Sequence, residues 1–204
     1  MAVDAVVFDI GNVLIEWHPE RFYDAEIGAE RRKELFATVP LEKMNLEVDR
    51  GAPFRASVEA LATAHPDWSV EIMLWHDRWI DMASPAIDES AVLLRALKKQ
   101  GVSVFALSNF GIETFAFAET VYPILTEFDR RWISGHLGVI KPDPAIYQLL
   151  EDQSGVPADR LLFTDDRPDN ISAAELRGWQ THLFEGPSGL SRRLVEEGFL
   201  ERAP

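Results

Sequence analysis

The sequence predicts an α/β fold: a Rossmann-like parallel sheet with helices on both faces, plus a small all-helical domain. The first observation is a set of short apolar segments rich in Val, Ile and Phe, at residues 5–8, 102–107, 131–134, 161–164 and 181–184. The second is that helical patterns lie between them, and this strand–helix alternation is typical of a parallel sheet. The third is a long interruption between residues 17 and 85, where no convincing strand occurs.

The helices expected around the sheet have recognisable ends. Residues 89–100 place three leucines on one helical face and stop at Gly101, a residue that adopts the left-handed conformation common after a helix. Residues 144–153 begin with a proline, which is favourable in a first helical turn. Residues 170–177 form a third helical pattern and are followed by a glycine. We expect these helices to cover the sheet.

The interrupting region contains only helical patterns. They are separated by prolines and lie at residues 21–27, 29–38, 54–64 and 70–82. We therefore expect residues 1–16 and 86–204 to form the α/β core and residues 17–85 to form a helical subdomain inserted after the first strand.

The composition narrows the classes of function and the cellular setting. The 204 residues are 47% hydrophobic, so a core can form, and the formal net charge of −14 argues against nucleic acid as a partner. There is no cysteine, so neither disulfides nor thiolate chemistry is available. No apolar run is long enough to span a bilayer, and the first residues do not resemble a secretory signal. We expect a soluble, cytoplasmic protein that does not bind membranes and is a monomer or a homodimer.

Polar residues follow the predicted strands. Those that follow the first four in chain order are Asp9, Gly11 and Asn12; Ser108 and Asn109; Lys141; and Asp165, Asp166 and Asn170. Each of them alone is more often a turn or helix-cap residue. The carboxyl ends of parallel strands meet at one edge of the sheet, however, and ligands bind there. Carboxylates, an amine, a hydroxyl and amides converging on one edge suit phosphoryl transfer.

These segments resemble the four motifs of the haloacid-dehalogenase-like (HAD) superfamily. The matching stretches are Val-Val-Phe-Asp9-Ile-Gly-Asn-Val-Leu, Ala-Leu-Ser108-Asn, Gly-Val-Ile-Lys141-Pro-Asp-Pro-Ala-Ile-Tyr and Leu-Phe-Thr-Asp165-Asp166-Arg-Pro-Asp-Asn170. The helical region lies where that superfamily carries its cap domain. The opening motif is similar to a branch that includes bacterial sugar-1-phosphate phosphatases.

The resemblance implies a role for each of these residues. Asp9 would attack phosphorus and form an aspartyl-phosphate, which water then hydrolyses. Mg²⁺ would be bound by the carboxylates of Asp9, Asp165 and Asp166 and by the backbone carbonyl of Gly11. Lys141 would neutralise charge on the nucleophile and the transferring group. The residues expected to bind the substrate or its phosphoryl oxygens are Ser108, Asn109, Gly11, Asn12 and His18. Asn170 would orient the metal or Lys141.

Gly11 departs from the phosphatase pattern. Many phosphatases of this superfamily have an aspartate at this position, which protonates the leaving oxygen. Three explanations remain open: a leaving group that needs no proton, a cap residue such as His18 or Glu16 that supplies it, or a different reaction. Gly11 also has a structural interpretation, as a position that needs close backbone approach or an unusual dihedral angle.

The sequence therefore predicts a Mg²⁺-dependent phosphatase that acts on a small phosphorylated metabolite, with a sugar phosphate as one candidate. The alternatives are a metal-independent 2-haloacid dehalogenase, because a halide leaves without a proton, and a non-catalytic module that binds a phosphate ligand.

Substrate specificity is expected from the cap, where the residues of interest are Trp17, His18, Arg21, Met44, Asn45, Arg50, Trp75, His76 and Trp79. Trp75 and Trp79 are expected to be core residues rather than a substrate platform.

Overall fold

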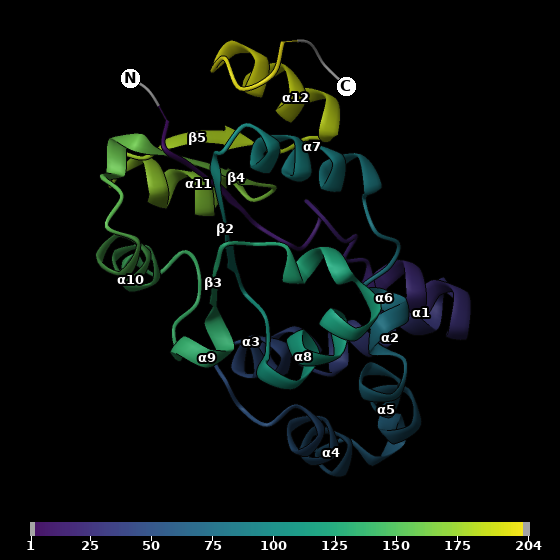
Figure 1. Cartoon of the computed structure of the whole chain (residues 1–204). Helices are drawn as coiled ribbons and strands as arrows, with labels where there is room; N and C mark the ends of the chain where they lie inside the picture. Colours follow the sequence, from purple (N-terminus) through teal and green to yellow (C-terminus); the bar gives the residue numbers. More distant parts are fainter. Residues whose placement is uncertain (1–2, 202–204) are drawn as a thin grey trace.

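The computed structural model describes residues 3–201, and its centre is a parallel five-stranded sheet in the order β3-β2-β1-β4-β5. The strands are β1 (Ala5–Phe8), β2 (Ser103–Ser108), β3 (Arg130–Ile133), β4 (Leu161–Asp165) and β5 (Gln180–Leu183). This arrangement confirms the predicted fold class (Figure 1). The strands of the inner part of the sheet are buried because helices cover both of its faces.

Alternate side chains of β1 point into two different hydrophobic clusters. Val6 and Phe8 belong to a cluster shared with α7 (Asp88–Lys99) and α12 (Pro187–Glu196). Val7 belongs to a cluster shared with α10 (Pro144–Ser154) and α11 (Pro168–Glu175). This follows from the two-residue period of a strand, which sends neighbouring side chains to opposite faces. The helices therefore lie on the two faces as expected (Figure 1).

Between β1 and α7 the chain forms a helical segment, residues 19–82. Its helices are α1 (Pro19–Ile27), α2 (Ala29–Thr38), α3 (Leu41–Asp49), α4 (Phe54–Ala64), α5 (Ser69–Asp77) and α6 (Trp79–Met82), and a 3₁₀ turn (Pro66–Trp68) precedes α5. No predicted helix covered α3. It forms because Leu41, Met44 and Val48, at helical spacing, are all buried. The single helix expected over residues 70–82 is wrong, since the helix breaks at Arg78, whose ψ angle is 22°.

Two stretches of chain connect the helical segment to the sheet, and they run side by side. The backbone N–H of Glu16 donates to the carbonyl of Pro85, and that of His18 donates to Met82, both at 2.9 Å. The N–H of Ile87 donates to the carbonyl of Leu14 at 2.8 Å. These bonds join residues 14–18 to residues 82–87.

The C-terminal end of α3 packs directly on the loops that follow β2 and β3. The Ser134 hydroxyl, at the start of α9 (Ser134–Leu137), donates to the Asp49 carbonyl at 2.6 Å. A Cβ on Gly51, whose φ is +102°, would lie 2.6 Å from the Gly135 carbonyl oxygen. A Cβ on Gly111, which precedes α8 (Ile112–Val121), would lie 2.6 Å from a Val48 methyl group. Backbones approach this closely only where glycine is present.

The remaining regular structure consists of two 3₁₀ turns, Pro123–Thr126 and Ala158–Arg160. Among residues 3–201, no helix is both long enough and apolar enough to cross a bilayer.

Candidate active site

Asp9 lies at the carboxyl end of β1, where its side chain is buried and accepts several hydrogen bonds. Its Oδ1 accepts from the Ser108 hydroxyl at 2.7 Å and from the backbone N–H of Ile10 at 2.7 Å. The Lys141 ammonium lies 2.9 Å from the same oxygen. Burial raises the pKa of Asp9; the Lys141 charge opposes this effect and the Asp165 charge adds to it. The carboxylate is thus fixed in direction by three donors from three parts of the chain.

Lys141 connects two carboxylates from neighbouring strands. Its ammonium donates to Oδ2 of Asp165, the last residue of β4, at 2.6 Å. Burial alone would lower the pKa of Lys141, but Asp165 and Asp9 outweigh it and the net shift is upward. The amine therefore stays charged between two buried carboxylates. Such a group suits the neutralisation of negative charge in a water-poor site.

Two asparagines hold the loops of the site in place. The Asn109 side chain donates to the Lys141 carbonyl at 2.9 Å and accepts from the Lys141 N–H at 2.7 Å. The Asn170 side chain donates to both carboxylate oxygens of Asp165 at 3.0 Å. Asn109 thus joins the loops after β2 and β3, and Asn170 orients the carboxylate that receives Lys141.

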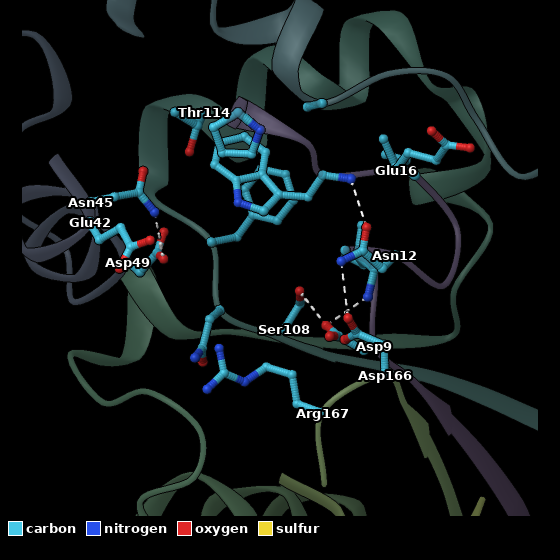
Figure 2. Close-up of a pocket in the computed structure, with 18 of the residues that line it drawn as sticks. Asp9, Asn12, Glu16, Glu42, Asn45, Asp49, Ser108, Thr114, Asp166 and Arg167 are labelled. Atoms are coloured by element: carbon cyan, nitrogen blue, oxygen red, sulfur yellow. Dashed lines mark hydrogen bonds between the residues drawn. The ribbon is translucent and has the colours of Figure 1, made fainter. Parts of the chain in front are cut away.

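Asp166 and Asn12 link the sheet to the helical segment. Asn12 donates from its amide to Oδ2 of Asp166 at 3.0 Å, and its amide oxygen accepts from the backbone N–H of Trp17 at 2.8 Å (Figure 2). Asn12 has a φ of 54°, in the left-handed region that asparagine tolerates better than most residues. Burial raises the pKa of Asp166, and the bond from Asn12 opposes this shift.

The carboxylates of Asp9, Asp165 and Asp166 form a cluster that fits a divalent cation. Each offers an oxygen, and these oxygens lie within 4.8 Å of one another. Oδ1 of Asn170 is buried beside Asp165 and has no hydrogen-bond partner among residues 3–201. Hard oxygen donors with an unpaired acceptor next to them are the ligand chemistry that Mg²⁺ prefers. The donor set therefore fits the predicted metal.

A cavity of about 590 Å³ opens above these side chains. The sheet contributes the polar groups just described, and the helical segment contributes most of the opposite wall. Part of that wall is aromatic, with Trp17, Trp75 and Trp79 in contact at ring-centroid distances of 6.0 and 5.9 Å. Trp75 and Trp79 are buried as expected, and yet both also line the cavity.

The sequence did not single out the acidic residues on α3 that face this cavity. Glu42, Asn45 and Asp49 share one face of the helix and lie across the cavity from Asp9 (Figure 2). Only Asn45 was among the residues of interest. The spacing of the three is typical of a helix face, but without α3 in the predicted fold that signal could not be used.

Gly11 and His18 are placed differently from the rest of the predicted set. Gly11 lines the cavity, and a Cβ on it would have no atom within 4 Å. Its φ is not positive. Neither close approach nor an unusual φ therefore explains this glycine.

His18 is not among the lining residues of the cavity; its side chain is 46% exposed and lies 3.6 Å from Glu16. Glu16 lines the cavity but is bound to Arg21 at 2.6 Å.

A family model for haloacid dehalogenase-like hydrolases matches residues 3–176. The chain belongs to this family of hydrolases. The match spans most of the chain and includes all the motif residues from Asp9 to Asn170. The predicted superfamily and the prediction of a hydrolase are both confirmed.

Three curated relatives share parts of their sequence with this hydrolase. Drimenol cyclase drtB of Aspergillus calidoustus is 24% identical over 95% of the chain and 36% of the relative. Sesquiterpene phosphatase astK of Aspergillus oryzae is 33% identical over 42% of the chain and 44% of the relative. Haloacetate dehalogenase H-2 of Moraxella is 30% identical over 43% of the chain and 39% of the relative. The chain therefore matches less than half the length of each.

A solved structure shows the same fold over nearly the whole hydrolase. The HAD family enzyme BT-2542 of Bacteroides thetaiotaomicron has a TM-score of 0.73 at 20% identity, covering 95% of this chain and 99% of that one. Its complex with magnesium and inorganic phosphate has a TM-score of 0.68 at 20% identity, covering 91% and 96%.

Proposed function

We propose that the protein is a Mg²⁺-dependent phosphatase that acts on a small phosphorylated metabolite through a covalent intermediate on Asp9. The observation that carries this proposal is the grouping of oxygens from Asp9, Asp165 and Asp166 within 4.8 Å of one another, with the buried amine of Lys141 bound to two of the three carboxylates. Carboxylates repel one another at this distance, so the group makes chemical sense as a cation site facing an anionic substrate. The magnesium and phosphate complex of BT-2542, which has the same fold, supports it.

The residues of this chain would act in two steps. An Asp9 oxygen attacks phosphorus, the phosphorus–oxygen bond to the leaving group breaks, and an aspartyl-phosphate forms. Water then attacks that phosphorus and releases phosphate and the free carboxylate. Ser108 and Lys141 hold Asp9 in direction, and Lys141 stabilises negative charge that develops on the phosphoryl oxygens. A bound Mg²⁺ would screen the charge of the phosphate from the nucleophile and stabilise the transition state.

We propose further that residues 17–85 act as the cap and set specificity. The wall that they contribute contains indole rings and also acidic side chains, which suits a metabolite with an apolar or ring-shaped body. A sugar phosphate fits this description, as does a phosphorylated terpenoid, the class indicated by the name of the relative astK. A substrate panel that contains both classes is therefore the appropriate screen.

The test is phosphate release from such a panel with Mg²⁺ and with EDTA. We expect release that requires Mg²⁺ and is abolished by Asp9→Asn. Asp67→Asn, which changes an exposed aspartate of the helical segment, is the matched control and should leave release unchanged. Release that survives both EDTA and Asp9→Asn would disprove the proposal.

The second candidate is a metal-independent 2-haloacid dehalogenase. Two observations favour it: Gly11 provides no acid, and the relative H-2 is a haloacetate dehalogenase. It predicts halide release from 2-chloropropionate in EDTA. The carboxylate cluster weighs against it, because a halide-displacing nucleophile gains nothing from two further carboxylates. A third possibility, a non-catalytic module, predicts saturable phosphate binding with no release from any substrate.

A further inference from the structure

The proposed phosphatase reaction leaves one proton unassigned. When the bond from phosphorus to an alkyl oxygen breaks, that oxygen needs a proton, because an alkoxide is a poor leaving group. An in-line displacement places the leaving oxygen on the side of phosphorus opposite Asp9. The proton donor is therefore expected across the cavity from Asp9, on the side that the helical segment forms.

Asp49, the last residue of α3, presents its carboxyl group there (Figure 2). Its Oδ2 accepts a hydrogen bond from the Asn45 amide at 3.1 Å. Asn45 is itself oriented by the Trp75 indole, which donates to its amide oxygen at 3.2 Å. A side chain oriented by a neighbour on its own helix is suited to proton transfer, which depends on geometry.

The surroundings of Asp49 also favour a carboxyl group that carries a proton near neutrality. Burial and the negative charge of Asp9 raise the pKa of Asp49 to about 7. The Gly111 N–H and the Arg50 guanidinium oppose this shift and are outweighed. A group whose pKa lies near the working pH can donate a proton in one step and accept one in the next.

The other acidic and imidazole groups near the cavity are less suitable. Glu16 is paired with Arg21, and His18 does not line the cavity. Glu20 and Glu42 line it but are exposed to solvent. Among the described residues of the helical segment that line the cavity, Asp49 is thus the partly buried carboxyl without a cation bound to it.

We propose that Asp49 is the general acid of the phosphatase reaction, replacing the aspartate that is missing at Gly11. In the first step its proton passes to the leaving oxygen as the bond to phosphorus breaks. In the second step the carboxylate takes a proton from the attacking water and returns to its acid form. The assignment rests on the proposed function, and it makes the helical segment part of the catalytic machinery.

The contacts of α3 with the sheet explain how Asp49 is positioned. The Ser134 hydroxyl binds the Asp49 carbonyl, and the close approach of Gly51 to Gly135 leaves no room to shift. These contacts therefore fix the position of Asp49 relative to Asp9.

The test compares two leaving groups in the same enzyme. Glycerol phosphate releases an alkoxide, which needs a proton, and p-nitrophenyl phosphate releases a stable anion, which does not. We expect Asp49→Asn to lower kcat for the alkyl ester by roughly 10²- to 10⁴-fold and for the aryl ester by less than about tenfold. Glu47→Gln, an exposed position of α3 that does not line the cavity, is the control and should leave activity on both esters nearly unchanged.

Two further variants keep the test independent of folding defects. Asp49→Glu retains an acid and should retain more alkyl-ester activity than D49N. Gly11→Asp, in the D49N background, introduces a carboxyl where a Cβ meets no atom within 4 Å and should restore part of the alkyl-ester activity selectively. An equal loss on both esters, or no loss, overturns the role of Asp49. A wild-type protein that releases phosphate with Mg²⁺ from neither ester nor any member of the substrate panel overturns the proposed function and this assignment with it.

Discussion

The Lys141 ammonium donates to Asp165 at 2.6 Å and lies 2.9 Å from Asp9, so one cation joins the carboxyl ends of β1 and β4. All three side chains are at least nine-tenths buried. We propose that this group of charges has both a structural and a chemical role, and the two can be separated by experiment.

Lys141→Met should destabilise the protein. It leaves two buried carboxylates without their cation, which typically costs about 3–5 kcal/mol in the free energy of unfolding. Urea denaturation in EDTA measures this loss without a metal that could substitute for the amine. The double variant K141M/D165N removes one of the stranded charges and should recover part of the stability but no activity. A single variant as stable as the wild type would contradict this account.

Asn12 should control metal affinity through Asp166. Asn12→Gly removes the amide that orients this carboxylate and keeps a residue that tolerates the φ of 54°. We expect the Kd for Mg²⁺, measured by calorimetry, to rise about 10- to 100-fold. Asn12→Ala should weaken binding equally and also cost about 1–2 kcal/mol of stability, because alanine is strained at this φ. Unchanged affinity in Asn12→Gly would show that the hydrogen bond has no role in metal binding.

The activity on alkyl phosphates should fall as the pH rises through about 7. The usual pKa of an aspartate is 3.8, and that of Asp49 is raised to about 7, so the carboxyl keeps its proton between these values and loses it above them. Only the protonated form can donate. Profiles of kcat against pH should show this fall above about pH 7 for glycerol phosphate but not for p-nitrophenyl phosphate. The D49N variant should show it for neither ester. If kcat for glycerol phosphate still falls above about pH 7 in D49N, the fall is caused by the titration of a different side chain.

The close contact between Gly51 and Gly135 should matter for chemistry as well as for folding. Gly51→Ala places a Cβ 2.6 Å from the Gly135 oxygen and forces α3 away from the sheet. We expect a selective loss of alkyl-ester activity, because Asp49 moves with the helix. Gly28→Ala is a matched control, since its φ of +82° imposes similar backbone strain but nothing lies within 4 Å of the new Cβ. Equal effects on activity would attribute the loss to strain alone.

The sheet and its strand-end residues could be predicted because the relevant signals are local. The segment around Asp9 is continuously apolar and ends in a polar residue, and the same holds for the segment before Asp165. In a parallel sheet the carboxyl ends of the strands lie at the same edge, and this does not depend on how the connecting helices pack. The distances from Asp9 to Ser108 and Lys141 follow from this topology.

Asp49 could not be predicted, because its role depends on where α3 packs. Nothing within residues 41–49 indicates that the helix ends against the loops after β2 and β3; that position follows from glycines at 51, 111 and 135. His18 illustrates the opposite case. It follows the first motif closely in sequence, yet its side chain does not line the cavity and is 46% exposed.

Asn12 bonds to Asp166 with one end of its amide and to the backbone of Trp17 with the other. A molecule that fills the aromatic side of the cavity and displaces the chain at Trp17 would, through these two hydrogen bonds, also change the orientation of Asp166 in the carboxylate cluster. Thermodynamic coupling of this kind is mutual, so occupancy of either location changes affinity at the other by the same factor. We therefore expect the Asn12 amide to couple occupancy of the aromatic side of the cavity to occupancy of the cation cluster.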